Sequence, residues 1–321
     1  MGKTALIFGI SGQDGAWLAQ LLLAKGYAVH GTSRDAEAGD FANLHALGLH
    51  AQVTLHSATP HDARSVLQTI AEVAPQEIYN LAGQSSVALS FEQPVETLES
   101  IAVGTLNILE AIRFLELPTR LYNAASGECF GNSNGMPASE TTPFHPRSPY
   151  AVAKAASFWQ VANYREAYGL FACSGLLFNH ESPLRPARFV TRKIVQGACR
   201  IAAGLQQELR LGDLSIRRDW GWAPEYVEAM WRMLQLPQAE DFVIATGVAH
   251  SLQQFVEVAF AEVGLDWRAH VQSDAGLRRP SDIALSVGDP AKAARLLGWR
   301  AEVGLSGIVA RMVAAERAAL G

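Results

Sequence analysis

The stretch "FGISGQDGAWL", residues 8–18, decides the fold. Gly9, Gly12 and Gly15 follow the apolar run "TALIFGI" and open the helical pattern of residues 13–25. Glycines at a strand-to-helix turn allow a tight bend and a close approach of the backbone to a ligand, and the helix N-terminus attracts a pyrophosphate. The G-x-x-G-x-x-G spacing at this position therefore predicts a dinucleotide-binding turn.

The first half of the chain alternates short apolar runs with helical patterns. Strands are expected at residues 4–10, 28–33, 53–57, 77–83, 120–126 and 171–179, with helices at 13–25, 61–74, 95–116 and from 149 onward. Runs that are apolar throughout are typical of strands buried on both faces of a parallel sheet. The pattern predicts a Rossmann-type, doubly wound α/β fold.

After residue 180 long amphipathic helices dominate, with short strands between them. This change indicates a smaller mixed α/β domain that binds the substrate. We expect residues 1–178, with returning segments at about 213–245, to form an NADP-binding Rossmann domain. Residues 179–212 and 246–321 are expected to form the second domain.

Composition narrows the class of protein. Among 321 residues 18% are charged and the net charge is −5, so no global charge favours nucleic acid or an anionic membrane. No apolar run approaches the roughly 18 residues of a membrane span. The three cysteines, Cys129, Cys173 and Cys199, have no disulfide or metal-ligand spacing. We therefore expect a cytoplasmic protein without a metal site.

The end of the second predicted strand bears on the choice of cofactor. The sequence there is "GTSRDAE", residues 31–37. Arg34 suits the 2′-phosphate of NADP. Asp35 follows directly, and an acidic residue near this position usually binds the ribose diol of NAD. NADP is favoured, and NAD remains open.

A helix with a clear start carries candidate catalytic residues. Ser148 can cap its N-terminus and Pro149 suits its first position. Tyr150 and Lys154 are then four residues apart on one face. An ammonium group beside a phenol favours the phenolate, which can act as a general base. After a nucleotide-binding half, Y-x-x-x-K is typical of the short-chain dehydrogenase/reductase superfamily.

The motif "ASGECFG", residues 125–131, lies where the active site of such a fold is expected. Ser126 ends the fifth strand and can bind a substrate oxygen, completing the Ser-Tyr-Lys set. Glu128 is an additional carboxylate, which favours proton abstraction beside a ketone; the alternative is a solvated turn residue. Cys129 is expected to pack in the core.

Taken as a whole, the chain resembles the GDP-mannose 4,6-dehydratase family of extended short-chain dehydrogenase/reductases. The most specific shared motifs are "NHESP" at 179–183 and "FVTRK" at 189–193. The resemblance implies that the catalytic residues are Ser126, Glu128, Tyr150 and Lys154. With the glycine turn, the implied cofactor site comprises Gly9, Ser11, Gly12, Gln13, Asp14, Gly15, Arg34, Leu81, Ala82, Gln84, Tyr150, Lys154, His180 and Arg185. The implied substrate site comprises Ser85, Ser126, Glu128, Asn179, Val190, Lys193, Arg218 and Arg279.

The resemblance further implies dehydration of GDP-D-mannose to GDP-4-dehydro-6-deoxy-D-mannose by internal hydride transfer through bound NADP. It also implies a homodimer or homotetramer. Three alternatives stay open: an NADPH-dependent GDP-4-keto-6-deoxymannose reductase, a dehydratase of another GDP-sugar such as a GDP-heptose, and a non-catalytic NADP-binding regulator. The chain departs from the family at Gly127, where a serine is usual.

Overall fold

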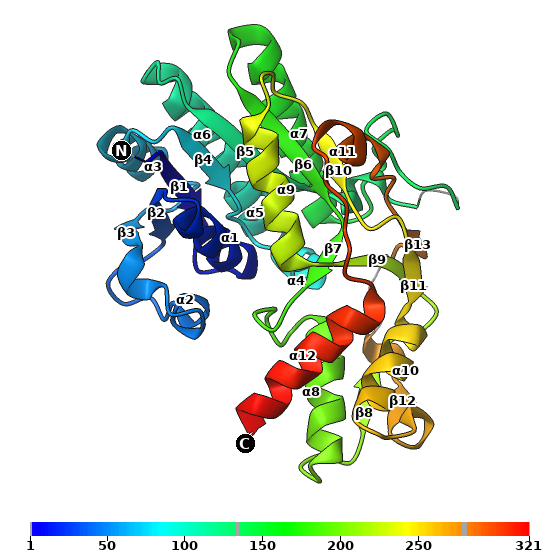
Figure 1. The fold of residues 1–321 in the computed structure, drawn as a ribbon. Coiled ribbons are helices and arrows are strands. Elements are labelled where there is room, and N and C mark those ends of the chain that lie inside the picture. The colour runs from blue at the N-terminus through cyan, green and yellow to red at the C-terminus, as the bar shows by residue number, and fades with distance from the viewer. Residues whose placement is uncertain (1, 133–134, 278–280, 321) are drawn as a thin grey trace.

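The computed structural model describes residues 2–132, 135–277 and 281–320. Its largest element is a parallel sheet of seven strands, in the order β3-β2-β1-β4-β5-β6-β10 (Figure 1). The order reverses between β1 and β4, and doubly wound sheets bind ligands beyond the strand ends at such a reversal. The predicted Rossmann-type fold is confirmed. The strands are β1 (Thr4–Phe8), β2 (Ala28–Ser33), β3 (Thr54–Ser57), β4 (Glu77–Asn80), β5 (Arg120–Ser126), β6 (Ala172–Leu177) and β10 (Phe242–Ile244).

Helices cover both faces of this sheet. On one face α1 (Gln13–Ala24) packs against α9 (Ala223–Gln235); on the other lie α3 (Ala63–Val73), α6 (Gly104–Phe114) and α7 (Pro149–Tyr168). Strand β1 serves both layers. Its residues Ala5 and Ile7 belong to the apolar cluster with α1 and α9, and Leu6 and Phe8 to the cluster with α3, α6 and α7. Burial on both faces explains why the strand is apolar throughout.

A second body packs beyond the carboxyl edge of the sheet (Figure 1). Strand β9 (Arg217–Trp222) pairs with β7 (Asn179–Glu181), β11 (Ala249–Ser251) and β13 (Leu285–Ser286), and β8 (Leu209–Leu211) pairs with β12 (Val271–Ser273). Around them α8 (Val190–Ala202), α10 (Leu252–Glu262) and α12 (Leu305–Leu320) enclose a separate apolar cluster. The strand expected over residues 171–179 is in fact two strands, because the chain leaves β6 at Phe178 and enters β7 in the other sheet.

The helix expected over residues 95–116 contains a wide turn. It consists of α5 (Pro94–Leu98), a π-helical turn (Glu99–Val103) and α6. The wide turn packs on the loop that follows β4. Gly83 has φ 117°, and a Cβ there would lie 2.8 Å from Ile101 Cγ1. In the same turn Ser100 Oγ accepts a hydrogen bond from the Gln84 N–H at 3.2 Å. The turn therefore holds this loop in place by packing and by a hydrogen bond.

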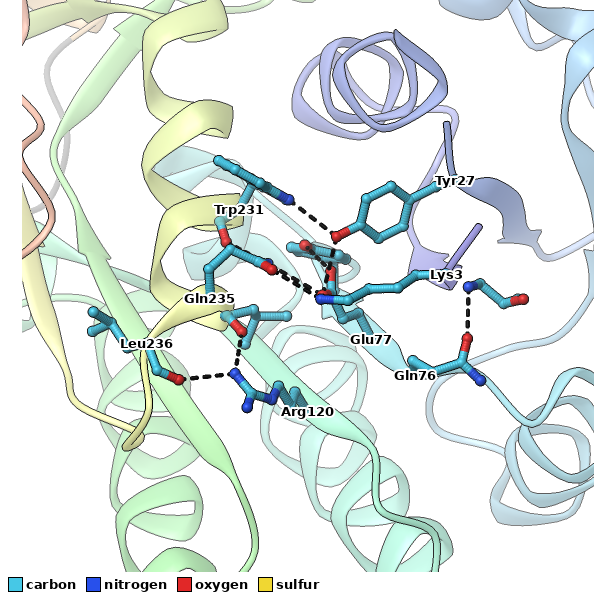
Figure 2. Close-up of polar contacts among 11 residues, drawn as sticks. Lys3, Tyr27, Gln76, Glu77, Arg120, Trp231, Gln235 and Leu236 are labelled. Atoms are coloured by element: carbon cyan, nitrogen blue, oxygen red, sulfur yellow. Dashed lines mark hydrogen bonds and ion pairs between the residues drawn. The ribbon is translucent and has the colours of Figure 1, made fainter. Parts of the chain in front are cut away.

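The amino edge of the sheet is held by one buried carboxylate (Figure 2). Glu77 is 1% exposed. It accepts hydrogen bonds from Lys3 Nζ at 2.8 Å, Tyr27 Oη at 3.1 Å, Tyr79 Oη at 2.7 Å and Gln235 Nε2 at 3.1 Å. These donors come from the start of the chain, the approach to β2, β4 itself and the end of α9. One side chain therefore ties the sheet to the helix layer.

Arg120 closes α9 at the same edge. Its guanidinium donates to the carbonyls of Leu234 at 2.7 Å and Leu236 at 2.8 Å, which are among the last acceptors of the helix (Figure 2). A cation at a helix C-terminus is favourable because the carbonyl ends carry partial negative charge. These contacts hold the amino edge of the sheet, whereas the two bodies meet at the opposite, carboxyl edge.

Candidate active site

The glycine turn has the geometry that a dinucleotide needs. Gly9 has φ 88°, and a Cβ there would lie 3.0 Å from the backbone of Ala82. A Cβ on Gly15 would lie 2.3 Å from the Gly9 carbonyl oxygen. Gly12 caps α1 without a side-chain hydrogen bond, which leaves the first amides of the helix facing outward. These positions fit a pyrophosphate at the helix N-terminus.

A cavity of about 440 Å³ and another of about 550 Å³ meet at this turn. The larger is the candidate cofactor cavity. It is lined by the predicted residues Gly9, Ser11, Gly12, Gln13, Asp14, Gly15, Arg34, Leu81, Ala82, Gln84 and Arg185. The ends of β2 and β3 complete it, with Thr32, Ala58, Thr59, Pro60 and His61. The sequence did not predict these five, although their place after parallel strands is a usable signal.

The smaller cavity is the candidate substrate cavity. It is lined by the predicted residues Ser85, Ser126, Glu128, Tyr150, Lys154, Asn179, His180, Val190, Lys193 and Arg218. Both cavities share a wall, formed by Asp14, Leu81, Ser85, Arg185, Arg188 and Phe189. The structure thus brings each predicted residue that it describes to one of two adjoining cavities. Arg279 lies outside the described residues.

Ser126 and Glu128 are held by a short turn at the end of β5. Ser126 Oγ accepts a hydrogen bond from the Glu128 N–H at 3.2 Å and so caps the 3₁₀ turn Gly127–Phe130. The turn packs closely on Phe178, since a Cβ on Gly127 would lie 3.0 Å from three atoms of that ring. Cys129 is fully buried, as expected, and burial raises its pKa to about 12, which keeps the thiol unreactive.

Helix α7 begins as predicted. Ser148 Oγ accepts from the Ala151 N–H at 3.1 Å, and Pro149 occupies the first turn. Lys154 Nζ is buried and donates to the Ala124 carbonyl at 2.6 Å. Burial lowers the pKa of Lys154 to about 8. Lysine on α7 is therefore anchored to β5, next to Ser126.

The acidity of Tyr150 differs from the sequence-based expectation. Burial raises the pKa of the phenol, and its hydrogen bond with Ser126 opposes the rise. Lys154 does not counteract it, because its Nζ lies 5.9 Å from the Tyr150 ring centroid and is directed at a backbone carbonyl. Tyr150 therefore holds its proton at neutral pH and is paired with Ser126 rather than with Lys154.

Asp14 and His180 form an ion pair between the two cavities. His180 Nδ1 lies 2.7 Å from the Phe178 carbonyl oxygen, and Nε2 lies 2.8 Å from Asp14 Oδ2. Both ring nitrogens face acceptors, so both must donate and the ring is an imidazolium. Burial by itself raises the pKa of Asp14, but the charge and hydrogen bond of His180 outweigh it and lower that pKa to about 2. For His180 burial lowers the pKa, and Asp14 outweighs it, so the net pKa is raised.

Arg188 and Trp220 also line the substrate cavity, and the sequence did not single them out. Arg188 directly precedes the motif "FVTRK", and its position beside that motif is the only signal the sequence offers. Trp220 follows Arg218 by two residues on β9, so the period of a strand places both on one face. Among the described residues, no three His, Cys, Asp or Glu side chains gather to hold a metal ion.

Comparison with known proteins adds a family to this geometry. A family model described as GDP-mannose 4,6 dehydratase matches residues 6–312. GDP-mannose 4,6 dehydratase 2 of Arabidopsis thaliana is 47% identical, over 97% of this chain and 86% of the relative. GDP-mannose 4,6-dehydratase of Vibrio cholerae is 43% identical, over 98% and 93%. Among solved structures, the UDP-glucose 4-epimerase of Thermus thermophilus in complex with NAD superposes with a TM-score of 0.86 at 27% identity, covering 98% of this chain and 99% of that one.

Proposed function

The chain belongs to the GDP-mannose 4,6-dehydratase family, and from this we propose that it converts GDP-D-mannose to GDP-4-dehydro-6-deoxy-D-mannose with a nicotinamide cofactor. One observation carries the proposal. Ser126, Glu128 and Tyr150 line one cavity, and that cavity adjoins the glycine-rich turn. A carboxylate beside a Ser-Tyr-Lys set is what a dehydratase needs and a simple dehydrogenase does not.

Each side chain has a step in this reaction. The phenolate of Tyr150 would take the proton of the C4 hydroxyl, whose oxygen Ser126 would hydrogen-bond. Because the phenol keeps its proton without ligands, this phenolate must form once the ligands are bound, when the positive charge of an oxidised nicotinamide would favour it. A nicotinamide cofactor held by the glycine turn and the other residues of the cofactor cavity would supply the redox chemistry, as acceptor of the C4 hydride and its donor to C6. The C4 ketone acidifies the C5 hydrogen; Glu128 removes that proton and delivers it to the C6 hydroxyl, which leaves as water. The proton taken by Tyr150 balances the one that C5 regains, so water is the only group lost.

We propose NADP as the cofactor. Ser33 and Arg34 line the cofactor cavity at the end of β2, where a cation can bind a 2′-phosphate. Asp35 does not line it. Its carboxylate accepts hydrogen bonds from the N–H groups of Glu37 and Ala38, each at 2.9 Å. The acidic side chain that could bind a ribose diol is thus used in its own turn, which supports NADP over NAD.

Incubation with GDP-D-mannose and either NADP⁺ or NAD⁺ tests the function. We expect loss of one water from the sugar, detected by mass spectrometry, faster with NADP⁺ and without net formation of NADPH. Stoichiometric consumption of added NADPH would indicate a reductase instead. Conversion of a GDP-heptose alone would indicate a dehydratase of another sugar. Binding of cofactor without conversion of any GDP-sugar would indicate a regulator and contradict the proposal.

We also propose a homodimer at least, and a cytoplasmic location. Large apolar side chains are exposed on the adjacent helices α5, α6 and α7, among them Val95, Phe114 and Trp159 at 67%, 72% and 61%; surfaces of this kind support self-association. The three cysteines are buried free thiols, in keeping with a reducing compartment. In the ranges that the structure describes, no helix is long and apolar enough to cross a membrane.

The two bodies of the structure suggest that the cofactor and the substrate bind to different parts of the chain. We propose that residues 1–178, with segments returning at about 213–245, bind the cofactor. Residues 179–212 and 246–321 would then bind the GDP-sugar. α9 packs on the first sheet and β10 lies in it, which supports the returning segment. β9 falls within 213–245 but lies in the second sheet and contributes Arg218 to the substrate cavity, which favours a return that begins at α9.

A further inference from the structure

The cations of the substrate cavity are held by protein groups, with one exception. Lys154 donates to the Ala124 carbonyl, Arg185 pairs with Glu181, Lys193 donates to the Arg210 carbonyl, and Arg218 pairs with Asp282. Arg188 is exposed, and no carboxylate among the described residues lies within ion-pair distance of it. Its one polar contact is with Ser85 Oγ, at 3.5 Å. Of its five guanidinium N–H donors, the four that do not face Ser85 are therefore available to a ligand.

Arg188 stands at the boundary of the two cavities. It lines both of them, and so does Ser85, which it contacts. It belongs to the segment between β7 and α8, in which Arg185 and Phe189 also line both cavities. No residue that the sequence singled out was assigned both to the cofactor and to the sugar nucleotide.

Two guanidinium groups lie close to the ring of Phe189 at this boundary. The Cζ atom of Arg185 lies 3.8 Å from the Phe189 ring centroid, and the Cζ atom of Arg188 lies 5.2 Å from it. Cation–π contacts of this kind orient both guanidinium groups around a single ring. Glu181 already compensates the charge of Arg185, so Arg188 is the cation of this pair that is left for an anionic ligand. The arrangement is suited to a ligand that carries several negative charges.

The N-terminus of the adjacent helix α8 adds to the positive potential at this boundary. α8 begins at Val190, and Phe189 provides no side-chain cap for its first amides. Val190, Thr191 and Lys193 from its first turns line the substrate cavity. A helix N-terminus favours an anion. The phosphates of the sugar nucleotide are thus expected close to Arg188 on one side, and the pyrophosphate of the cofactor at the glycine turn on the other.

We propose that Arg188 is a phosphate ligand shared by the cofactor and the GDP-sugar, and that it couples their binding. A planar guanidinium can donate to two anions at once. Placed between two diphosphates, it offsets their mutual repulsion, so each ligand binds more tightly in the presence of the other. Such coupling is reciprocal. This inference rests on the proposed function, since it requires both ligands to be bound together.

Calorimetric titration tests the coupling without using activity. The dissociation constant of GDP is measured on the full chain with and without saturating NADP⁺, for the wild type, Arg188→Ala and Arg188→Lys. We expect Arg188→Ala to weaken GDP binding about tenfold with NADP⁺ present, as for loss of one charge-assisted contact, and far less without it. Arg188→Lys keeps the charge but loses the fork, and we expect it to lose most of the coupling.

Arg200→Ala is the matched control, because Arg200 is exposed on α8 and lines neither cavity. Equal weakening of GDP binding by Arg188→Ala with and without NADP⁺ would show a ligand of the sugar nucleotide alone and overturn the proposal. Unchanged GDP binding would show a solvated surface arginine and overturn it too. If wild-type chain converts GDP-mannose but shows no coupling, only this inference fails; if it binds NADP⁺ but not GDP, the proposed function fails with it.

Discussion

Glu128 distinguishes a dehydratase from a dehydrogenase at the level of one residue. Its amide is fixed by Ser126 and its side chain lines the substrate cavity. Glu128→Gln keeps the shape of this side chain but cannot accept the C5 proton. We expect activity to fall at least 100-fold, in the range usual for a general acid–base group. Nucleotide binding should be unchanged, because the residue does not line the cofactor cavity.

Product analysis and titration with GDP and NADP⁺ check this prediction. Glu166→Gln, an exposed residue on α7 outside both cavities, serves as the control. Full dehydratase activity in Glu128→Gln would show that another group removes the C5 proton.

In the ion pair of Asp14 and His180, the imidazolium neutralises a carboxylate that lies beside the expected phosphate site. His180→Asn would leave the Asp14 carboxylate without its cation at the N-terminus of α1, where the pyrophosphate is expected. We expect NADP⁺ affinity to fall about tenfold. Adding Asp14→Asn removes the repelling charge and should restore part of that affinity. No recovery in the double variant would show that the imidazolium contacts the cofactor itself.

The same pair predicts a pH dependence of stability. The pKa of His180 is raised above 6.5, so its contribution is complete below that pH and is lost as the pH rises through the raised value. The pKa of Asp14 is lowered from 3.8 to about 2, so its contribution is complete above 3.8 and is lost as the pH falls from there through about 2. The difference in melting temperature between the wild type and His180→Asn should therefore be largest at pH 5 to 6 and shrink at alkaline pH. A constant difference would contradict the pairing.

The sequence predicted which residues belong to the active site better than it predicted the contacts that they make. Ser126, Tyr150 and Lys154 were identifiable because the end of a strand, a helix cap and helical spacing can each be recognised from neighbouring residues in the sequence. The pairing of Tyr150 with Ser126 instead of Lys154 depends on the side-chain packing of a helix against a strand, which spacing does not specify. Gly127 was identifiable as a missing hydroxyl, but only the structure shows the Phe178 ring occupying the adjacent space.

At the scale of elements, one face of β9 lines the substrate cavity and the other face holds the strand in place. Arg218 and Trp220 line the substrate cavity. Asp219 between them is fully buried on the other side. Its carboxylate accepts hydrogen bonds from Thr246 Oγ1 at 2.7 Å and from the N–H groups of Thr246 and Gly247, each at 2.9 Å. Asp219 thereby fixes the strand that carries Arg218.

Thr246→Val removes one of these donors, and Thr246→Ser retains it. Because the strand would be held less firmly, we expect Thr246→Val to raise KM for GDP-mannose severalfold with little change in kcat or in NADP⁺ affinity. Thr246→Ser should resemble the wild type. Steady-state kinetics with cofactor titration decides the matter, and equal losses in KM and kcat for both variants would argue for general destabilisation.

The long elements could be predicted, and so could the short strands β8 and β10 in the runs "QELRLG" (207–212) and "FVIATG" (242–247), but β7 and β13 could not. β1 to β6 were visible as apolar runs, and α7 by its cap. β7 reads "NHE" and β13 only "LS", and both pair with β9, a strand distant from them in sequence. Strands of two or three residues have no usable period, so their pairing is fixed by tertiary contacts.

Over the whole molecule, Glu77 joins layers that are distant in sequence. Glu77→Ala would leave the buried hydroxyl of Tyr79 and the half-buried hydroxyl of Tyr27 without their acceptor. We expect the free energy of unfolding to fall by about 2–4 kcal/mol. KM for GDP-mannose should not change in the remaining folded enzyme, because the cluster lies at the edge opposite the cavities. Denaturant unfolding together with kinetics tests both statements; a change in KM at unchanged stability would contradict them.

The wide turn of residues 99–103 makes its helix sensitive to the count of residues as well as to their identity. A π turn closes over five residues, so it absorbs one residue more than an α turn. Deleting one of the five would close an ordinary α turn in its place and leave α6 in phase with the preceding helix. The loop after β4 would then lose the wide turn on which Gly83 and Gln84 pack. A one-residue deletion or insertion within α6 has no such outlet and would rotate the residues after it by about 100°.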